Sequence, residues 1–411
     1  MTVNNRWFQL GASLVAMIMI ANLQYAWTLF VNPLRESNGW TLAEVQWAFT
    51  VFILCQTWVQ PLDGWLIDRL GPRGFISAAG VLCGLGWAGM GYATSLPMLY
   101  ALYALAGTGA AFVYSGCIGS ALKWFQDRRG FAAGVIAAGF GGGTALFIPI
   151  IAAIIEGRGY RDALIWTGIL QGIVIFVVAQ FLRHPGHGPA TATAGAGKAP
   201  AARHHFTTAE MVRTPHFYAM YVAFVLMGVG GLMVTAQAGP MAQAFGLGVG
   251  ALTLAATVSP LANAASRIFW GWASDRIGRE LAMIVAFVLQ AVALLLVVGV
   301  GHLSPGWFAL TLVLVYFTWG EIYSLFPAMS GDYFGPKHAT SNYAVLYTAK
   351  GVASIVGGGL AAVLFQQFGT WTAAFYGTAA LALIAAGIAV GLRAVGAPAA
   401  RVAAVPAPTV V

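Results

Sequence analysis

Charged residues are scarce in this 411-residue sequence: Asp, Glu, Lys and Arg make up only 8% of it, whereas 59% is hydrophobic. A soluble domain contains about 25% charged residues, so the composition excludes an ordinary soluble protein and predicts a polytopic membrane protein. Cysteine is also rare. Cys55, Cys83 and Cys117 lie in apolar runs without the spacing of a disulfide or metal site, so we expect no redox role and no metal.

The residue patterns of several enzyme and pump classes are missing as well. The sequence has no Walker-type loop G-x-x-x-x-G-K-[ST], and its histidines lie in predicted loops. The glycine runs at 139–143 and 357–359 fall inside predicted helices, where glycine more often permits close packing or bending than phosphate binding. We therefore expect no enzyme, no ATP-driven pump and no cofactor.

What the sequence does contain is a series of apolar segments long enough to span a bilayer, for which about 20 residues suffice. They lie at 8–31, 42–66, 74–93, 96–122, 131–155, 163–182, 217–244, 250–273, 282–301, 304–329, 341–366 and 371–394. They predict an all-α membrane protein of twelve helices, with one six-helix half at 1–182 and another at 217–394. The Ala-, Gly- and Pro-rich segment 183–216 is predicted to be a cytoplasmic linker, and 395–411 a cytoplasmic tail.

The distribution of Lys and Arg predicts the orientation in the membrane. With a cytoplasmic N-terminus, fifteen of these residues fall in cytoplasmic loops and only Arg35, Arg158 and Arg161 lie outside. This asymmetry predicts that both termini are cytoplasmic and that the protein is a multi-pass protein of the plasma (inner) membrane. The sequence pI of about 9.5 then reflects topology, and no nucleic-acid partner is expected.

The two remaining cations, Arg267 and Lys350, lie in the middle of apolar segments. Even low estimates put the cost of a mid-bilayer cation at about 2.5–3.5 kcal/mol, so each needs compensation. Glu321 is the only acidic residue that we place in a comparable setting, which leaves at least one cation without a protein partner and favours an anionic substrate. The alternative is a structural role, in which backbone carbonyls or Glu321 satisfy the cations.

Polar and aromatic residues near mid-span are further candidates for the wall of a binding cavity. Helical periodicity puts Trp319 and Tyr323 on one face of their span and Glu321 on the opposite face, where it could pair structurally, be protonated or serve proton coupling. Neutral hydrogen-bond donors are available from Gln24, Gln56 and Gln60. The aromatic candidates, for which helix packing is the alternative, are Tyr25, Trp27, Tyr114, Phe140, Trp319, Tyr323 and Tyr347.

The two halves contain a repeated motif. GWLIDRLGPR at 64–73 matches GWASDRIGRE at 271–280. We expect Asp68 and Asp275, which precede Arg69 and Arg276, to cap or pair near a helix end, and the following glycine to permit a tight turn. A D-R-x-G motif after the second span of each half resembles the major facilitator superfamily. The segments QYAWTLF, KWFQDRRGFAAG, YFTWG and AKGVASIVGGG further resemble its oxalate/formate antiporter branch.

This resemblance implies two six-helix halves around a midplane site and a secondary active oxalate:formate antiporter working by alternating access. It also implies that Arg267 and Lys350 bind the two carboxylates of oxalate, inside a wall formed by Tyr25, Tyr114, Trp319 and Tyr323. The expected partners are small carboxylate anions, oxalate and formate, and the lipid bilayer, and the expected functional unit is a monomer.

Three positions depart from the pattern of that branch: Tyr347 replaces a tryptophan, Phe140 a tyrosine and Glu321 a glycine. The ring changes alter the volume and the hydroxyl count of the cavity, whereas the glutamate adds a titratable group. A proton-coupled symporter of lactate- or pyruvate-like monocarboxylates is therefore the alternative function. A channel or a transporter-like receptor is the rival from another class.

Overall fold

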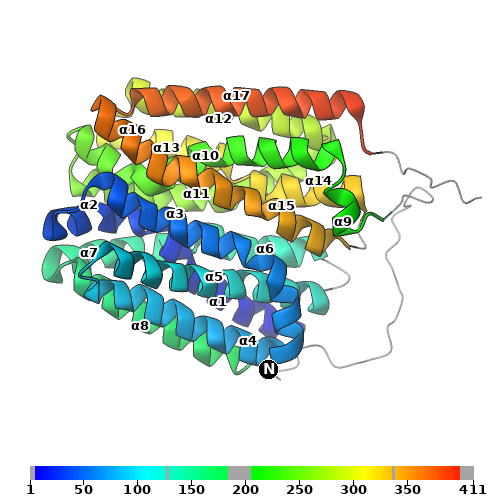
Figure 1. Ribbon diagram of the computed structural model, residues 1–411, viewed down its shortest axis with the longest axis horizontal. Coiled ribbons are helices and arrows are strands. Elements are labelled where there is room, and N and C mark those ends of the chain that lie inside the picture. Colours follow the sequence, from blue (N-terminus) through cyan, green and yellow to red (C-terminus); the bar gives the residue numbers. More distant parts are fainter. Residues whose placement is uncertain (1–4, 126–128, 184–204, 336–337, 399–411) are drawn as a thin grey trace, which may run out of the picture.

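The computed structural model describes residues 5–125, 129–183, 205–335 and 338–398, and within these ranges all regular structure is helical. Twelve helical stretches are long and apolar enough to cross a membrane, which confirms the predicted number of spans. An even number of crossings returns the chain to the side on which it began. The N-terminus and the end of the last helix accordingly both lie toward the right of Figure 1.

The first six spans are built from α1 (Arg6–Tyr25), α2 (Trp27–Asn38), α3 (Leu42–Trp58), α4 (Gln60–Gly89), η1 (Met90–Tyr92), α5 (Leu96–Trp124), α6 (Arg129–Gly142), η2 (Gly143–Leu146), α7 (Ile148–Arg158) and α8 (Tyr160–Ala179). Local sequence signals set their ends. The Asn5 side chain accepts a hydrogen bond from the Trp7 backbone nitrogen at 2.9 Å at the start of α1. Thr41 and Glu44 form a capping box at the start of α3.

The other six spans are built from α10 (Pro215–Ala244), α11 (Val249–Ile277), α12 (Arg279–Val300), α13 (Pro305–Trp319), α14 (Ile322–Phe334), α15 (Ala339–Ser354), the π-helix η4 (Ile355–Leu360), α16 (Ala361–Phe368) and α17 (Thr372–Val395), preceded by the short α9 (Thr208–Met211). Several spans in both sets are interrupted near mid-length: at Ala26, at η2, between α13 and α14, and at η4. Irregular backbone is tolerated inside a membrane where protein surrounds it, so these interruptions indicate a buried functional region.

Helices α1–α8 form the lower part of the molecule in Figure 1, and α10–α17 form the upper part. Glycine allows close packing within each part. A Cβ atom on Gly86 would lie 2.5 Å from the Ala106 nitrogen, and one on Gly168 would lie 2.5 Å from the Ala88 nitrogen. Small residues are needed at such helix crossings because backbones that approach this closely leave no room for a side chain.

At the end of the molecule remote from the termini, buried hydrogen bonds join the two parts. The Gln46 Nε2 atom donates to the Ala236 carbonyl at 2.7 Å and to Gln237 Oε1 at 3.0 Å. The Gln237 amide in turn donates to the Gly358 carbonyl in η4 at 2.9 Å. Thr50 Oγ1 donates to the Ser354 carbonyl at 2.9 Å. We call Gln46, Thr50, Gln237 and Gly358 the polar seal.

The two parts also meet nearer the termini. The Trp58 indole nitrogen donates to the Thr348 carbonyl at 3.2 Å. A Cβ atom on Gly351 would lie 2.5 Å from Thr57 Oγ1, so the end of α3 and the last turn of α15 are in direct contact. Contacts between the parts therefore flank the interior from both ends.

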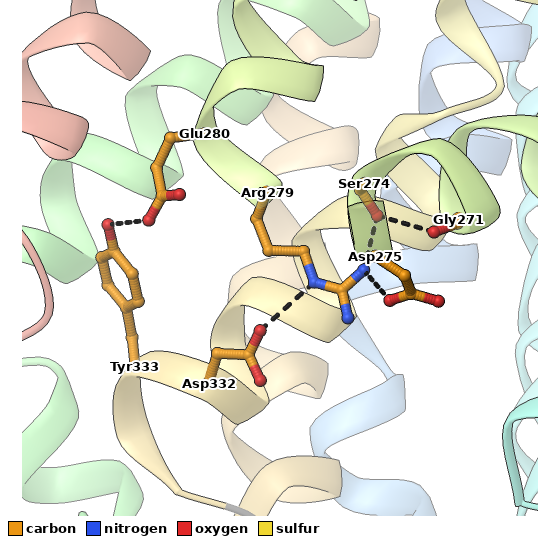
Figure 2. A network of polar contacts seen from close by, with 7 residues as sticks. All are labelled: Gly271, Ser274, Asp275, Arg279, Glu280, Asp332 and Tyr333. Carbon is orange, nitrogen blue, oxygen red and sulfur yellow. Dashed lines mark hydrogen bonds and ion pairs between the residues drawn. The ribbon is translucent and has the colours of Figure 1, made fainter. Parts of the chain in front are cut away.

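The second copy of the repeated motif forms a polar network where α11 ends, α12 begins and α14 ends (Figure 2). Asp275 pairs with Arg279 at 2.6 Å, which confirms that this aspartate pairs near a helix end. Arg279 also contacts Asp332 at 3.2 Å, whereas the Arg276 guanidinium lies 3.8 Å from the centre of the Trp272 ring. Gly278 has a positive φ of 92° between α11 and α12, as the predicted tight turn requires.

The first copy of the motif is only partly described. Gly71 has a φ of 66° inside α4, so this glycine too sits at a tight turn between two helical segments. The side chains of Asp68 and Arg69 lie outside the described residues. Their predicted role in capping or pairing stays a prediction.

Candidate binding site

The two predicted mid-membrane cations are both buried in the interior of the molecule. Arg267, in α11, is 5% exposed, and Lys350, in α15, is fully buried. The Arg267 guanidinium lies 4.6 Å from the centre of the Tyr323 ring, and the Lys350 ammonium lies 5.6 Å from the same ring. One aromatic side chain thus contacts both cations. Such cation–π contacts give only part of the stabilisation that a desolvated charge needs.

Arg267 is held by two neutral acceptors. Its Nε donates to Asn263 Oδ1 at 3.1 Å, one helical turn away, and its Nη1 donates to the Ala137 carbonyl of α6 at 2.9 Å. Its Nη2 is buried and has no hydrogen-bond partner among the residues that the structure describes. A Cβ atom on Gly141 would lie 3.2 Å from the Arg267 Nε, so a glycine at this position gives the guanidinium room against α6.

Lys350 is held mainly by two glutamines from the other part of the molecule. Its Nζ donates to Gln24 Oε1 at 2.8 Å and to Gln56 Oε1 at 2.6 Å, with a longer contact of 3.3 Å to the Tyr347 hydroxyl. Gln24 and Gln56 were expected as neutral donors, but toward Lys350 both act as acceptors through Oε1. The Gln60 side-chain amide donates to the Gln56 backbone carbonyl at 3.3 Å, and no contact joins Gln60 to either cation among the described residues.

Aromatic rings surround the cations. Tyr114 and Tyr347 stack with their ring centres 5.7 Å apart and 13° between their planes. Phe140 lies 5.5 Å from both Tyr25 and Tyr114, and its centre is 5.6 Å from the Lys350 Nζ. Trp319 and Tyr323, which periodicity placed on one face, have ring centres 5.4 Å apart. The structure therefore links by direct contacts Arg267, Lys350, Gln24, Tyr25, Tyr114, Phe140, Trp319, Tyr323 and Tyr347, a group that we call the cage.

Several donors in and beside the cage are buried without a hydrogen-bond partner in the described part of the chain. They are Arg267 Nη2, Gln24 Nε2, Gln56 Nε2, Trp319 Nε1 and the hydroxyl groups of Tyr323 and Tyr343. Buried polar groups are nearly always paired, so each exception calls for an explanation. All six can donate to a negatively charged oxygen, so an anion with several acceptor atoms would satisfy donors of this kind.

Span ten is interrupted between Trp319 and Ile322, and the residues at this break pack closely against α10 and α11. A Cβ atom on Gly320 would lie 2.1 Å from Ser266 Oγ and 2.9 Å from Asn263 Oδ1, so only glycine permits this approach to α11. The preceding Trp319 lies flat against Gly231 of α10, where a Cβ atom would be 2.0 Å from the indole ring. Two glycines on different helices therefore fix the Trp319 side of the cage.

The interpretation that Glu321 is the only acidic residue in an apolar setting is wrong. Glu321 is fully buried and neither of its oxygens has a hydrogen-bond partner among the described residues, so it does not compensate Arg267 or Lys350. However, Glu321 is not the only acid in an apolar setting. Asp63, at the end of the second span, is 3% exposed and accepts a hydrogen bond from the Ser115 hydroxyl. The sequence interpretation missed it although it lies within the predicted span 42–66, three residues before the end of that span.

Two further groups hold Arg267, and they differ in the signal that they leave in the sequence. Asn263 lies four residues before Arg267, which is the spacing of helix neighbours, and it contacts that arginine. The Ala137 carbonyl gives no signal in the sequence, because any residue type could supply a backbone acceptor. Its role depends on how α6 packs against α11.

Comparisons with known proteins identify the family of this chain. A family model of the Major Facilitator Superfamily matches residues 12–238 and 218–408. The chain is 39% identical to the oxalate:formate antiporter of Oxalobacter formigenes, over 94% of this chain and 91% of that protein. It is 26% identical to the uncharacterized MFS-type transporter YhjX of Escherichia coli, over 85% and 86% of the two chains. It is also 27% identical to human monocarboxylate transporter 11, over 87% and 77%.

Proposed function

Because this chain belongs to the major facilitator superfamily, in the branch that includes the oxalate:formate antiporter, we propose that it exchanges oxalate for formate by alternating access. It is a multi-pass membrane transporter. The observation that carries the proposal is the pair of buried cations. The contacts of Arg267 and Lys350 are all with neutral groups, so an anionic substrate is the missing compensation.

Oxalate suits this site because it has two carboxylates, one for each cation. The Arg267 Nη2 atom offers unpaired N–H groups to the first carboxylate, and charge-assisted hydrogen bonds of this kind are among the strongest in proteins. Lys350 can serve the second, together with the free amide groups of Gln24 and Gln56. Aromatic rings that are stacked or tilted against one another lie around the two cations.

The same charges supply the coupling. Two cations in a low-dielectric interior make reorientation costly for a carrier without substrate, whereas a bound dianion neutralises both. Only the loaded form then crosses readily between the two access states, and exchange becomes obligatory. If oxalate dianion enters as formate monoanion leaves, one negative charge moves inward in each cycle. Against an inside-negative potential this costs about 2.3 kcal/mol per 100 mV, so a substrate gradient must drive it.

The two six-helix halves, 1–182 and 217–394, would rock about the cage, with the segment 183–216 connecting them. We place both termini in the cytoplasm, the protein in the plasma membrane and the functional unit as a monomer, on the basis of the Lys and Arg distribution and of a site that one chain completes. The polar seal then closes the outer end of the pathway.

Counterflow in proteoliposomes tests the proposal. Vesicles that contain the purified chain and unlabelled oxalate or formate should take up labelled oxalate many times faster than vesicles loaded with chloride. A channel would show no such acceleration from the far side. A panel of small carboxylates in the same assay identifies the preferred pair, and absence of oxalate counterflow alongside strong transport of another anion would overturn the proposed substrate.

The alternative, proton-coupled transport of a monocarboxylate, is favoured by one observation. Glu321 is a buried carboxyl group without a partner in the described structure, and an ionised carboxylate is very costly there, so the group is well suited to hold a proton. Relatives named monocarboxylate transporters are distant from this chain. Net uptake of lactate driven by an inward proton gradient would support this alternative over exchange.

A further inference from the structure

We propose that Asn263 is the positioning residue of Arg267, fixing the guanidinium so that its Nη2 edge faces the substrate. This inference rests on the proposed function, because it concerns how the same site binds a carboxylate. Asn263 itself is fully buried in α11, one helical turn before Arg267. It does not have to touch the substrate to act.

The hydrogen bonds of Arg267 define its orientation. Asn263 Oδ1 accepts from Nε at 3.1 Å, and the Ala137 carbonyl accepts from Nη1 at 2.9 Å, which leaves Nη2 unpartnered among the described residues. A carboxylate can bind a guanidinium side-on, through Nε and one Nη, or end-on, through the two Nη atoms. Since Asn263 occupies Nε, the side-on approach is closed. The end-on approach, with Nη2 as its free member, remains.

The position of Asn263 is itself tightly determined. A Cβ atom on Gly320 would lie 2.9 Å from the Asn263 Oδ1 atom, and one on Gly141 would lie 3.3 Å from it. Two glycines from different helical segments therefore leave room for the amide oxygen. On its other edge, the Asn263 Nδ2 atom donates to the Tyr25 hydroxyl at 3.5 Å.

These contacts explain why an amide suits this position better than a carboxylate. Aspartate would have a similar shape and would also accept from Nε, but its negative charge would neutralise Arg267 in place of the substrate. A neutral acceptor orients the arginine and leaves its charge for the anion. Asn263 thus preserves the positive charge of the cage while restricting its direction.

The test compares Asn263→Ala and Asn263→Asp with wild type in counterflow assays, using labelled oxalate and labelled formate. The matched control is Ser266→Ala, which removes another buried polar side chain of α11 that contacts the Asn263 carbonyl but not Arg267. Asn263→Ala should raise the half-saturation concentration for both anions by about tenfold to 150-fold, the effect of losing one hydrogen bond to a charged group, with the maximal rate changed less than about threefold. Asn263→Asp should bind both anions more weakly than Asn263→Ala does, and Ser266→Ala should have a half-saturation concentration near that of wild type.

A merely structural asparagine predicts a different pattern. The maximal rate and the amount of folded carrier would then fall, half-saturation would stay unchanged, and the near-isosteric aspartate would be the milder substitution; this outcome would overturn the proposal. If Asn263→Ala does not yield monodisperse protein, Asn263→Gln replaces it. In Asn263→Gln the longer side chain displaces the acceptor oxygen, so the half-saturation concentration should still rise. An unchanged half-saturation concentration would overturn the proposal.

The wild-type measurement separates this inference from the proposed function. Absence of oxalate counterflow by wild type contradicts the substrate assignment alone. The variants are then compared with whichever carboxylate of the panel wild type carries. A selective rise in half-saturation for that anion supports the role of Asn263, and its absence refutes that role.

Discussion

Replacing Lys350 with glutamine should separate the transport of dianions from that of monoanions. The Lys350 Nζ atom donates to Gln24 at 2.8 Å and to Gln56 at 2.6 Å, and the ring centre of Tyr347 is 5.4 Å away. Glutamine removes the charge but retains a donor for the two glutamine oxygens, so the variant should fold. What it loses is the cation for the second carboxylate of oxalate.

The expected rise in the half-saturation concentration for oxalate follows from the loss of that single contact. A hydrogen bond to a charged group contributes about 1.5–3 kcal/mol, which corresponds to roughly a tenfold to 150-fold higher half-saturation concentration for oxalate. Formate has one carboxylate, which Arg267 can hold alone, so its half-saturation should change less than about threefold. The selectivity between the two anions, rather than the loss of either one, is the distinguishing result.

Counterflow of labelled oxalate and of labelled formate, measured on the same vesicles, provides the comparison. Ser341→Ala is a suitable control, because Ser341 is an exposed polar residue earlier in α15. Equal losses for oxalate and formate in Lys350→Gln would refute the assignment of one carboxylate to each cation. Lys350 would then be a structural residue or a requirement of the conformational cycle itself.

The twelve spans and the two cations were predictable because membrane burial leaves a strong signal in the sequence. An apolar run of sufficient length can hardly be anything but a span, and a cation within it is conspicuous because of its cost. The aromatic candidates were also predictable from their mid-span positions. Their contacts were not, since Tyr114 and Tyr347 come from different halves and stack only after the halves assemble.

Other features depend on backbone geometry, for which residue types give little warning. The glycine run at 357–359 was predicted to lie in a helix that packs closely. It does pack closely, as a Cβ atom on Gly357 would lie 2.8 Å from the Val229 carbonyl, but its backbone is a π-helix. Similarly, the Ala137 carbonyl becomes a ligand of Arg267 through tertiary packing alone. Asp63 was overlooked although it lies within the predicted span 42–66, because only its burial in the folded chain distinguishes it from an acid at the membrane surface.

Three further predictions concern the other charged and polar groups. Arg267→Gln should abolish oxalate exchange and Arg267→Lys should lose most of it, because only the planar guanidinium can bond Asn263 and Ala137 while still offering Nη2; substantial counterflow by a correctly inserted glutamine variant would contradict this. Gln46→Leu removes the three buried hydrogen bonds of the Gln46 side chain, with the Ala236 carbonyl, Gln237 Oε1 and the Trp27 indole, worth about 1 kcal/mol each, so amide hydrogen exchange at 236–239 should quicken roughly tenfold or more; unchanged exchange would show that the seal does not hold this end closed. Glu321→Gln should leave oxalate/formate exchange largely intact, because glutamine keeps the size and hydrogen-bonding capacity of a side chain that contacts neither cation in the described structure. Uptake measured with and without an inward proton gradient decides this last case: strong proton-driven uptake of lactate by wild type, lost in Glu321→Gln while exchange persists, would replace the exchanger with the proton-coupled symporter.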